Sequence, residues 1–194
     1  PSVKVHELVK FHSEFAPGGE ALYTTTFVMS MNKKKYESLA PDQRVVINAP
    51  AIDGSINLKG SRIDDVSLKN FYETIQDKEA KRAAGEIKLL SPEGTERAFV
   101  ATVAWGNAGF FSDDVVWSQT NTGPLTPENP LKLQFANVDL RIDRTISIDS
   151  DYMFVIADVL TNLGAAPLTV QPSAQVRQRL LPEHTTTPVS EQQA

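Results

Sequence analysis

The residues best suited to metal binding are the three histidines, His6, His12 and His184. A zinc pair on one helix face needs histidines four residues apart, whereas His6 and His12 are six apart. His184 lies in a polar stretch near the C-terminus. This spacing favours ordinary surface histidines, and we predict no metal ligand.

Three acidic clusters could supply paired carboxylates for acid–base catalysis or ligands for calcium. They are Asp64-Asp65, Asp113-Asp114 and Asp149-Ser150-Asp151. A calcium loop carries oxygen ligands at alternating positions around a glycine, and none of the three clusters continues in that way. We interpret all three as turn formers, in which the carboxylate accepts hydrogen bonds from nearby backbone amides.

Motifs for phosphate binding and nucleophilic catalysis are missing from the sequence. Gly18-Gly19 lacks the lysine and hydroxyl residue that complete a phosphate-binding loop. There is no G-x-S-x-G motif, and the absence of cysteine excludes thiolate nucleophiles and disulfides. We therefore predict no catalytic residue, no cofactor-binding residue and no cofactor.

Four aromatic residues surround the glycine-containing connection at residues 106–109: Trp105, Phe110, Phe111 and Trp117. Such a group could line a ligand groove, as in sugar-binding β-sandwiches. Large aromatic side chains also supply much of the buried area of a core. We favour the core interpretation.

The composition limits the kinds of partner. A net charge of −5 and a pI near 5.2 argue against a nucleic-acid surface, so we predict no nucleic-acid partner. The one basic run, Lys33-Lys34-Lys35, is interpreted as a solvated helix face. No run approaches the roughly 18 apolar residues of a membrane span, and none is predicted. Because the chain begins at Pro1, we expect a processed or excised piece.

Most of the sequence predicts short β-strands. In residues 140–148 the even-numbered positions are assigned to a buried face and the odd-numbered positions to a solvated face. The short link 149–151 predicts an antiparallel hairpin with the next strand, and Gly54 and Gly60 are interpreted as turns. Strands are predicted at residues 21–31, 44–48, 55–59, 62–64, 65–69, 85–91, 97–105, 131–135, 138–148, 152–162 and 167–171. The fold class is therefore mainly β, an antiparallel β-sandwich with a short α/β N-terminal segment.

The remaining segments have less regular patterns. Residues 75–84 predict a surface helix or loop, and Asn32 is a plausible N-cap for a helix over residues 33–39. Residues 3–11 fit either a short helix or an edge strand. The polar tail 182–194 is predicted to be disordered.

Residues 40–50, APDQRVVINAP, can be interpreted in two ways. Pro41-Asp42-Gln43 could open a helix, because proline and an acidic residue suit a first helical turn. Alternatively, residues 44–48 form a β-branched strand that Ala49-Pro50 stops. We place a seam here and assign the strand to the C-terminal side of it.

From about Arg44 to about Glu183 the chain resembles the first large periplasmic domain of YidC-type membrane protein insertases. The residues that carry this resemblance are Ile56 to Thr74 (INLKGSRIDDVSLKNFYET), Leu125-Thr126-Pro127, Asp143 to Asp149 (DRTISID), Tyr152-Met153-Phe154 and Asn162 to Pro167 (NLGAAP). The resemblance implies a partial β-supersandwich, a periplasmic location and contacts with translocon components and nascent membrane proteins. It weakens after Val170, because Ser173 replaces an aromatic residue and no glycine precedes Pro182.

The N-terminal residues are similar to a different family, the C-terminal region of DctP-type solute-binding proteins of TRAP transporters. The matching phrases are FAPGGE (15–20), FVMSMNK (27–33), YESL (36–39) and PDQ (41–43). The sequence thus suggests an α/β segment at residues 1–43, a β-sandwich at 44–181 and a disordered tail at 182–194. The family's substrate-binding arginine lies in a region absent here, so no ligand residue is transferred.

The sequence leaves three functions open. The first is a non-catalytic periplasmic domain of an insertase that acts through protein contacts, with self-association through open sheet edges. The second is a TRAP-type solute-binding module. The third is a mutarotase-like domain, which is disfavoured because that chemistry needs positioned His and Glu residues in a cleft.

Overall fold

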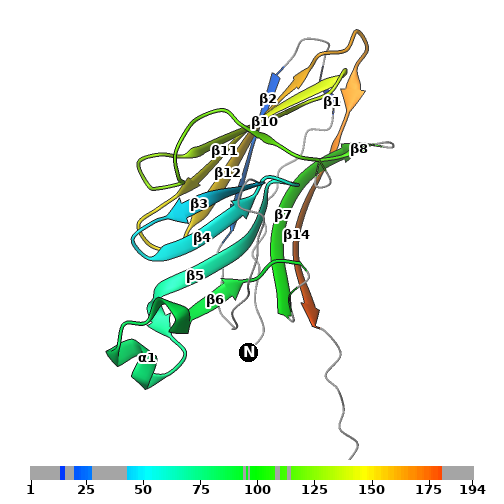
Figure 1. The fold of residues 1–194 in the computed structure, drawn as a ribbon. Helices are drawn as coiled ribbons and strands as arrows, with labels where there is room; N and C mark the ends of the chain where they lie inside the picture. The colour runs from blue at the N-terminus through cyan, green and yellow to red at the C-terminus, as the bar shows by residue number, and fades with distance from the viewer. Residues whose placement is uncertain are drawn as a thin grey trace, which may run out of the picture.

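The computed structural model describes residues 14–15, 20–27, 43–93, 95, 97–107, 110–112 and 115–180. This part of the chain is built almost entirely of antiparallel β-strands (Figure 1). The strands are β1 (Glu14–Phe15), β2 (Glu20–Phe27), β3 (Arg44–Asn48), β4 (Ile52–Asn57), β5 (Arg62–Tyr72), β6 (Glu86–Leu90), β7 (Arg97–Asn107), β8 (Phe110–Phe111), β9 (Ser118–Gln119), β10 (Leu131–Ala136), β11 (Leu140–Ile148), β12 (Phe154–Asn162), β13 (Leu168–Thr169) and β14 (Gln171–Leu180). The helical elements are α1 (Ile75–Glu79) and the short 3-10 turn η2 (Ala83–Gly85).

Two large sheets share one apolar core. A five-stranded sheet has the order β2-β12-β11-β10-β9, and a seven-stranded sheet has the path β14-β7-β5-β4-β3, with β6 on β5 and β8 on β7. Buried side chains of both sheets belong to the same cluster, among them Ile52, Val66 and Leu90 from one sheet and Ile142, Ile156 and Leu160 from the other. The predicted β-sandwich class is confirmed.

The alternation predicted for residues 140–148 is present in β11, where buried and half-buried residues alternate without a break. β11 pairs with β12 in an antiparallel hairpin, from Leu140 opposite Asn162 to Ile148 opposite Phe154. The link between them is the predicted turn, because Asp149 Oδ1 accepts hydrogen bonds from the backbone N of Asp151 (2.9 Å) and Met153 (3.0 Å).

The strand interpretation of the seam is correct. β3 pairs with β4 in an antiparallel register that places Val45 opposite Ile56, and Val45 and Ile47 are buried in the core. The helix that Pro41-Asp42-Gln43 could have opened does not extend into residues 44–48, because burying two β-branched side chains on one face of a sheet stabilises the strand.

The turn predicted at Gly54 is wrong. It lies inside β4 with φ +137°, and a Cβ atom added there would come within 2.0 Å of the carbonyl oxygen of Asp65. The residue is therefore required by the close approach of β5 rather than by a turn. Gly60, with φ 71°, does lie in the turn that leads to β5.

The predicted helix or loop at residues 75–84 contains the short helix α1. Thr74 is its N-cap and accepts a hydrogen bond from the backbone N of Asp77 at 3.0 Å. None of the helix residues is buried. No helix in the described part of the chain is long and apolar enough to cross a membrane.

Both described strands of the N-terminal region pair with strands from the later part of the chain, β1 with β13 and β2 with β12. β2 pairs with β12 in antiparallel register from Glu20 opposite Thr161 to Phe27 opposite Phe154. The division at residues 43 and 44 stays a prediction, as does the disordered tail. The predictions for residues 3–11, 33–39 and 182–194 fall outside the described residues.

Candidate interaction surface

The clearest open surface in the described chain is the outer edge of β14. This strand pairs with β7 from Gln171 opposite Gly106 to Leu180 opposite Arg97, and it ends the path of the seven-stranded sheet. Figure 1 shows β7 and β14 curving together down one side of the molecule, with β14 outermost. No described residue pairs with the second edge of β14.

The hydrogen bonds of β7 show which β14 groups point outward. Trp105 donates its backbone N–H to Ser112 Oγ (2.7 Å) and accepts from Ser112 N (2.9 Å), and Phe99 exchanges two backbone bonds with Ser91 (2.8 and 3.0 Å). Both β7 residues thus direct their amide and carbonyl groups away from β14. In an antiparallel pair of strands, two residues directly opposite each other either both direct their backbone N–H and C=O groups toward the partner strand or both direct them away from it.

The even-numbered residues of β14 therefore face the free edge. Trp105 lies opposite Pro172 and Phe99 lies opposite Gln178, so these positions and the two between them direct backbone groups outward. Ala174, Val176 and Gln178 each present one donor and one acceptor. Pro172 presents only its carbonyl oxygen, which is why a proline is tolerated in this strand.

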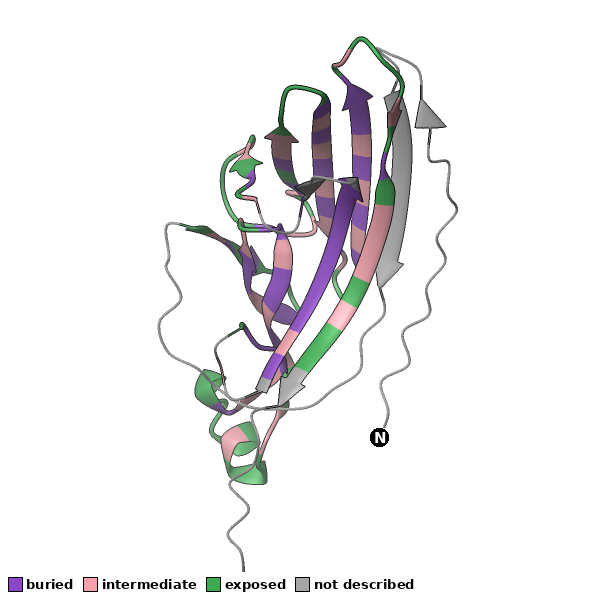
Figure 2. Cartoon of the chain, turned by 90° about the vertical axis from the view of Figure 1, so that its right-hand side faces the viewer, coloured by how far each residue is buried: buried purple, intermediate pink, exposed green. Residues whose placement is uncertain are grey.

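The two faces of β14 differ in polarity. Ala174 and Val176 pack in part against the core, whereas Gln171, Gln175 and Arg177 are exposed. Figure 2 shows β7 mostly buried along its described length, while β14 is mainly half-buried and exposed. An added strand would cover the half-buried side chains of the inner face.

A hollow of about 320 Å³ lies over β7 and β14 and is lined by Glu93, Ala98, Val100, Arg177 and Gln178. The carboxylate of Glu93 lies 3.1 Å from Arg62 Nη1 and 3.7 Å from Arg177 Nη1. Ala98 and Val100 give the hollow an apolar part, and Glu93 and Arg177 give it charged groups.

The outer face of β3, β4 and β5 carries a connected polar network. Arg44 donates from Nε to Ser55 Oγ at 2.8 Å and forms an ion pair with Asp64. Ser55 Oγ donates to Asp65 Oδ2 (2.7 Å), and Lys88 Nζ lies 2.8 Å from Asp65 Oδ1. Asp64-Asp65 therefore lies within β5, and its interpretation as a turn former is wrong, because Arg44 and Lys88 satisfy the carboxylates in the middle of the sheet.

Asp64 is the buried acid of this network. Its burial raises its pKa above the ordinary 3.8, and the neighbouring Asp65 adds to the rise, while the hydrogen bond and charge of Arg44 oppose it. The Asp64 side chain is only 3% exposed.

A second, shallow hollow of about 470 Å³ lies over β3 and β4. Its lining residues are Val46, Ile47, Asn48, Asp53, Gly54, Lys69 and Pro124. Lys69 Nζ donates to Ala49 O at 2.8 Å and to Asn48 Oδ1 at 3.3 Å, so its ammonium group is already engaged with the protein. Val46 is 58% exposed and adds an apolar side chain to the lining.

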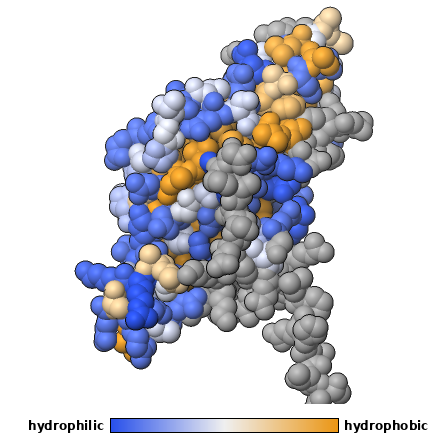
Figure 3. All heavy atoms as spheres, in the orientation of Figure 1, coloured by the Kyte–Doolittle hydropathy of each residue, from blue (hydrophilic) through white to orange (hydrophobic). Residues whose placement is uncertain are grey.

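The end of the five-stranded sheet carries a small apolar tip. Val138, between β10 and β11, is 86% exposed, and Leu163, just after β12, is 47% exposed. Their segments are joined by a hydrogen bond from Leu163 N to Asp139 O at 2.8 Å. Figure 3 shows hydrophobic atoms at this upper end and in a second band across the middle of the view.

The core interpretation of the aromatic residues is confirmed for the two whose side chains the structure describes. Trp105 and Trp117 are almost fully buried, and the side chains of Phe110 and Phe111 lie outside the description. Trp105 Nε1 donates to Asp158 Oδ2 at 2.7 Å, and the guanidinium of Arg144 lies 4.6 Å from the centre of the Trp117 ring. These rings hold the two sheets together and do not line a groove.

Sequence reasoning missed Arg144 and Asp158 as buried partners. The available signal was their position, since Arg144 interrupts the buried face of β11 and Asp158 interrupts the buried face of β12. It also missed β14, because Pro172 and the run of Gln, Ser and Arg residues weaken any strand pattern.

Metal binding finds no support among the described residues, which contain no group of three or more His, Cys, Asp or Glu side chains that could hold an ion. His6, His12, His184, Gly18-Gly19 and Asp113-Asp114 lie outside the described part of the chain. Chemically, the described surfaces offer strand pairing, hydrogen bonding and apolar contact.

Comparisons with known proteins point to one family. The family model for the YidC periplasmic domain matches residues 44–193. The protein named "Membrane protein insertase YidC" of Nitrobacter hamburgensis is 39% identical over 145 residues, which cover 72% of this chain and 23% of that protein. The protein of the same name in Bradyrhizobium diazoefficiens is 39% identical over 152 residues, with shares of 75% and 24%. No solved structure gives a significant match.

A third relative extends the match toward the N-terminus. The protein of the same name in Rhizobium etli is 35% identical over 168 residues, 83% of this chain and 26% of that protein. This share is larger than residues 44–194 could supply, so the alignment includes residues before Arg44. None of these matches supports the resemblance to TRAP solute-binding proteins. The chain spans about a quarter of the length of these relatives.

Proposed function

The chain belongs to the YidC periplasmic domain family, and from this premise we propose that it is a non-catalytic domain that acts by contacting other polypeptides during membrane protein insertion. The family places the chain in the periplasm, at the inner membrane in the parent protein. The proposed contacts are with nascent membrane proteins and with periplasmic parts of the translocon. Self-association through an open sheet edge is a further contact of the same kind.

The observation that carries this proposal is the free edge of β14. Three consecutive outward-facing residues, Ala174, Val176 and Gln178, offer backbone donors and acceptors without a described partner. An extended polypeptide can bind such an edge by main-chain hydrogen bonds, with affinity that depends little on its sequence. That property suits a domain that meets many different substrates.

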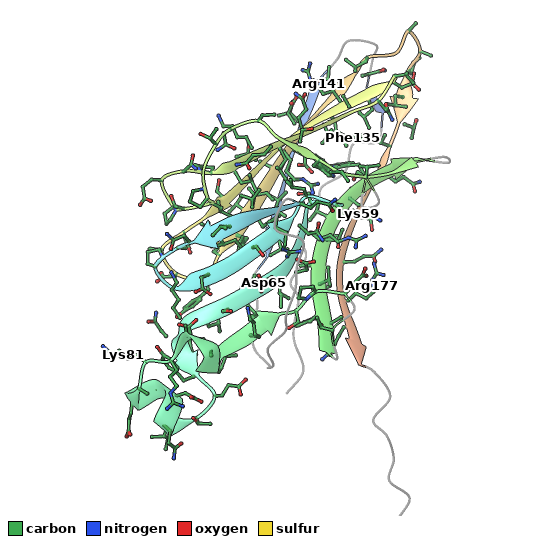
Figure 4. The ribbon with its side chains drawn as sticks, in the orientation of Figure 1. Lys59, Asp65, Lys81, Phe135, Arg141 and Arg177 are labelled. Carbon is green, nitrogen blue, oxygen red and sulfur yellow. The ribbon has the colours of Figure 1, made fainter. Side chains whose placement is uncertain are left out.

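The test is site-specific photocrosslinking from the purified chain. A photoreactive residue replaces Gln175 on β14 in one sample and Lys81, next to α1, in the matched control. Figure 4 places Lys81 beside α1, in a different part of the molecule from Arg177 and the rest of β14. The partners are ribosome-bound nascent chains of an inner-membrane protein and, separately, purified periplasmic fragments of the translocon.

We expect crosslinks from position 175 to at least one of these partners and few from position 81. Equal yields from both positions, or none from position 175, would contradict a contact role for this edge. A matched nascent chain of a cytosolic protein controls for nonspecific capture.

A further inference from the structure

We propose that two copies of the chain associate through their β14 strands, which pair antiparallel about a two-fold axis at Gln175. This inference rests on the proposed function, since it assigns the open edge one defined partner. The axis is perpendicular to the sheet, so that the inner faces of both copies lie on the same side. Each seven-stranded sheet then continues into that of the other copy.

The backbone groups of β14 fit this arrangement. With Gln175 on the axis, Ala174 of each copy lies opposite Val176 of the other, and both residues direct their amide and carbonyl groups toward the partner. Gln178 lies opposite Pro172, a pair that can form only one bond because proline has no N–H. About six intermolecular backbone hydrogen bonds result.

The charges of β14 are compatible with this register and disfavour registers centred nearer the C-terminal end of the strand. Arg177 lies opposite Ser173 and Arg179 lies opposite Gln171, so no arginine faces an arginine. A register centred on Val176 would bring Arg177 diagonally to within about 7–8 Å of its copy, and one centred on Arg177 would place the two side by side. Pairing about Gln175 keeps them about 14 Å apart.

The side chains on the inner face gain burial. Ala174 and Val176 are half-buried at the margin of the core, and they lie opposite each other across the proposed axis. No charged residue occurs between Asp158 and Arg177, so the strand enters the pairing with neutral side chains along most of its length. The edge thus lacks most of the inward charges and bulges that block strand addition.

Cysteine crosslinking tests the register directly, because the natural chain contains no cysteine. Residues on the two-fold axis form a non-hydrogen-bonded pair with Cα atoms about 4.5 Å apart, which a disulfide can span. Gln175→Cys should therefore form a covalent dimer under mild oxidation. Ser173→Cys and Arg177→Cys should each stay monomeric alone, and an equal mixture of the two should give the mixed dimer.

A second measurement detects association without any crosslink. Val176→Pro removes an outward N–H but no bond to β7, so the fold should remain while association is lost. Sedimentation equilibrium of the natural chain should show a concentration-dependent dimer, and Val176→Thr, which keeps the N–H, should retain it. Far-UV circular dichroism and tryptophan emission check that each variant is folded.

The outcomes separate this inference from the function on which it rests. Equal disulfide yields from Gln175→Cys and Ser173→Cys, or a monomer at all concentrations, would overturn the pairing. Photocrosslinks from position 175 to a nascent chain would still support the contact role in that case. Loss of both results would overturn both proposals.

Discussion

Arg144 and Asp158 lie directly opposite each other on β11 and β12, and their side chains meet inside the core through two hydrogen bonds of 2.7 Å. Arg144 is 1% exposed and Asp158 2%. Each side-chain nitrogen of Arg144 has a partner, since Nη1 donates to Val103 O (2.8 Å), and Asp158 Oδ2 also accepts from Trp105 Nε1 (2.7 Å). The pair therefore links the five-stranded sheet to β7 of the seven-stranded sheet.

Arg144→Met should destabilise the protein by about 3–5 kcal/mol, because it leaves the carboxylate of Asp158 buried without a counter-charge. Combining it with Asp158→Leu should recover part of that loss, although Trp105 Nε1 and Val103 O then lack their partners. Urea unfolding of the single and double variants, monitored by the emission of the two buried tryptophans, measures the coupling energy.

The matched control for that cycle is Arg141→Met. Arg141 forms an ion pair with Asp143 at 2.8 Å on the exposed face of the same strand. Its loss should cost less than about 1 kcal/mol. A loss at Arg144 as small as that at Arg141 would show that the buried pair does not stabilise the sandwich.

Gly54→Ala should disrupt the pairing of β4 with β5, because the added methyl group would lie 2.0 Å from the carbonyl oxygen of Asp65 and the backbone has φ +137°. Gly123→Ala is the matched control. Gly123 also has a positive φ, +86°, but its nearest neighbour is a side-chain atom of Asn129 at 3.4 Å. The control should lose about 1–2 kcal/mol from strain alone, and Gly54→Ala at least twice as much. Equal midpoints of thermal unfolding would contradict the steric argument.

The pH dependence of stability should contain a contribution from Asp64. Burial raises its folded-state pKa above 3.8, so between 3.8 and that raised pKa the folded protein binds more protons than the unfolded chain. This group therefore makes the free energy of unfolding increase as the pH falls through that window. Arg44 and Asp65 are the charged neighbours that modulate the effect.

Asp64→Asn removes that contribution and leaves the other acids in place. Urea unfolding at several pH values should show a smaller gain in stability on acidification for the variant than for the natural chain. A larger gain in the variant would mean that Arg44 outweighs burial and lowers the pKa of Asp64.

Pro172→Ala should strengthen self-association, because each copy gains an outward N–H that can bond to Gln178 of the other. Two added hydrogen bonds of about 1 kcal/mol each correspond to roughly 30-fold tighter dimerisation. Monomer stability should fall by less than about 1 kcal/mol, through the greater freedom of the unfolded chain. Sedimentation equilibrium measures the first effect and urea unfolding the second; unchanged association would argue against pairing through this edge.

Much of the fold could be predicted from local patterns. The alternation in β11, the turn at Asp149 and the β-branched run Val45 to Ile47 were sufficient to predict strands that the structure contains. Each of these signals lies within a few residues of sequence, because side chains in a strand alternate between two faces and turns depend on local backbone geometry.

The candidate site was harder to predict. β14 has few residues of high strand propensity and contains a proline, and it is a strand because β7 supplies hydrogen bonds along its length. Asp64-Asp65 has the composition of a turn, yet it lies within β5 because Arg44 and Lys88 satisfy its carboxylates. In both cases the deciding partner is distant in the sequence.

The sequence by itself determined the class of the protein: an acidic, cysteine-free, antiparallel β chain with the motifs of the YidC periplasmic domain family. Only the tertiary structure decided that Arg144 is buried opposite Asp158 and that the even-numbered residues of β14 face outward. The physical reason is that hydrogen-bond direction and charge burial depend on which strands lie side by side. Packing across the whole chain decides which strands are neighbours, and the local sequence pattern does not specify them.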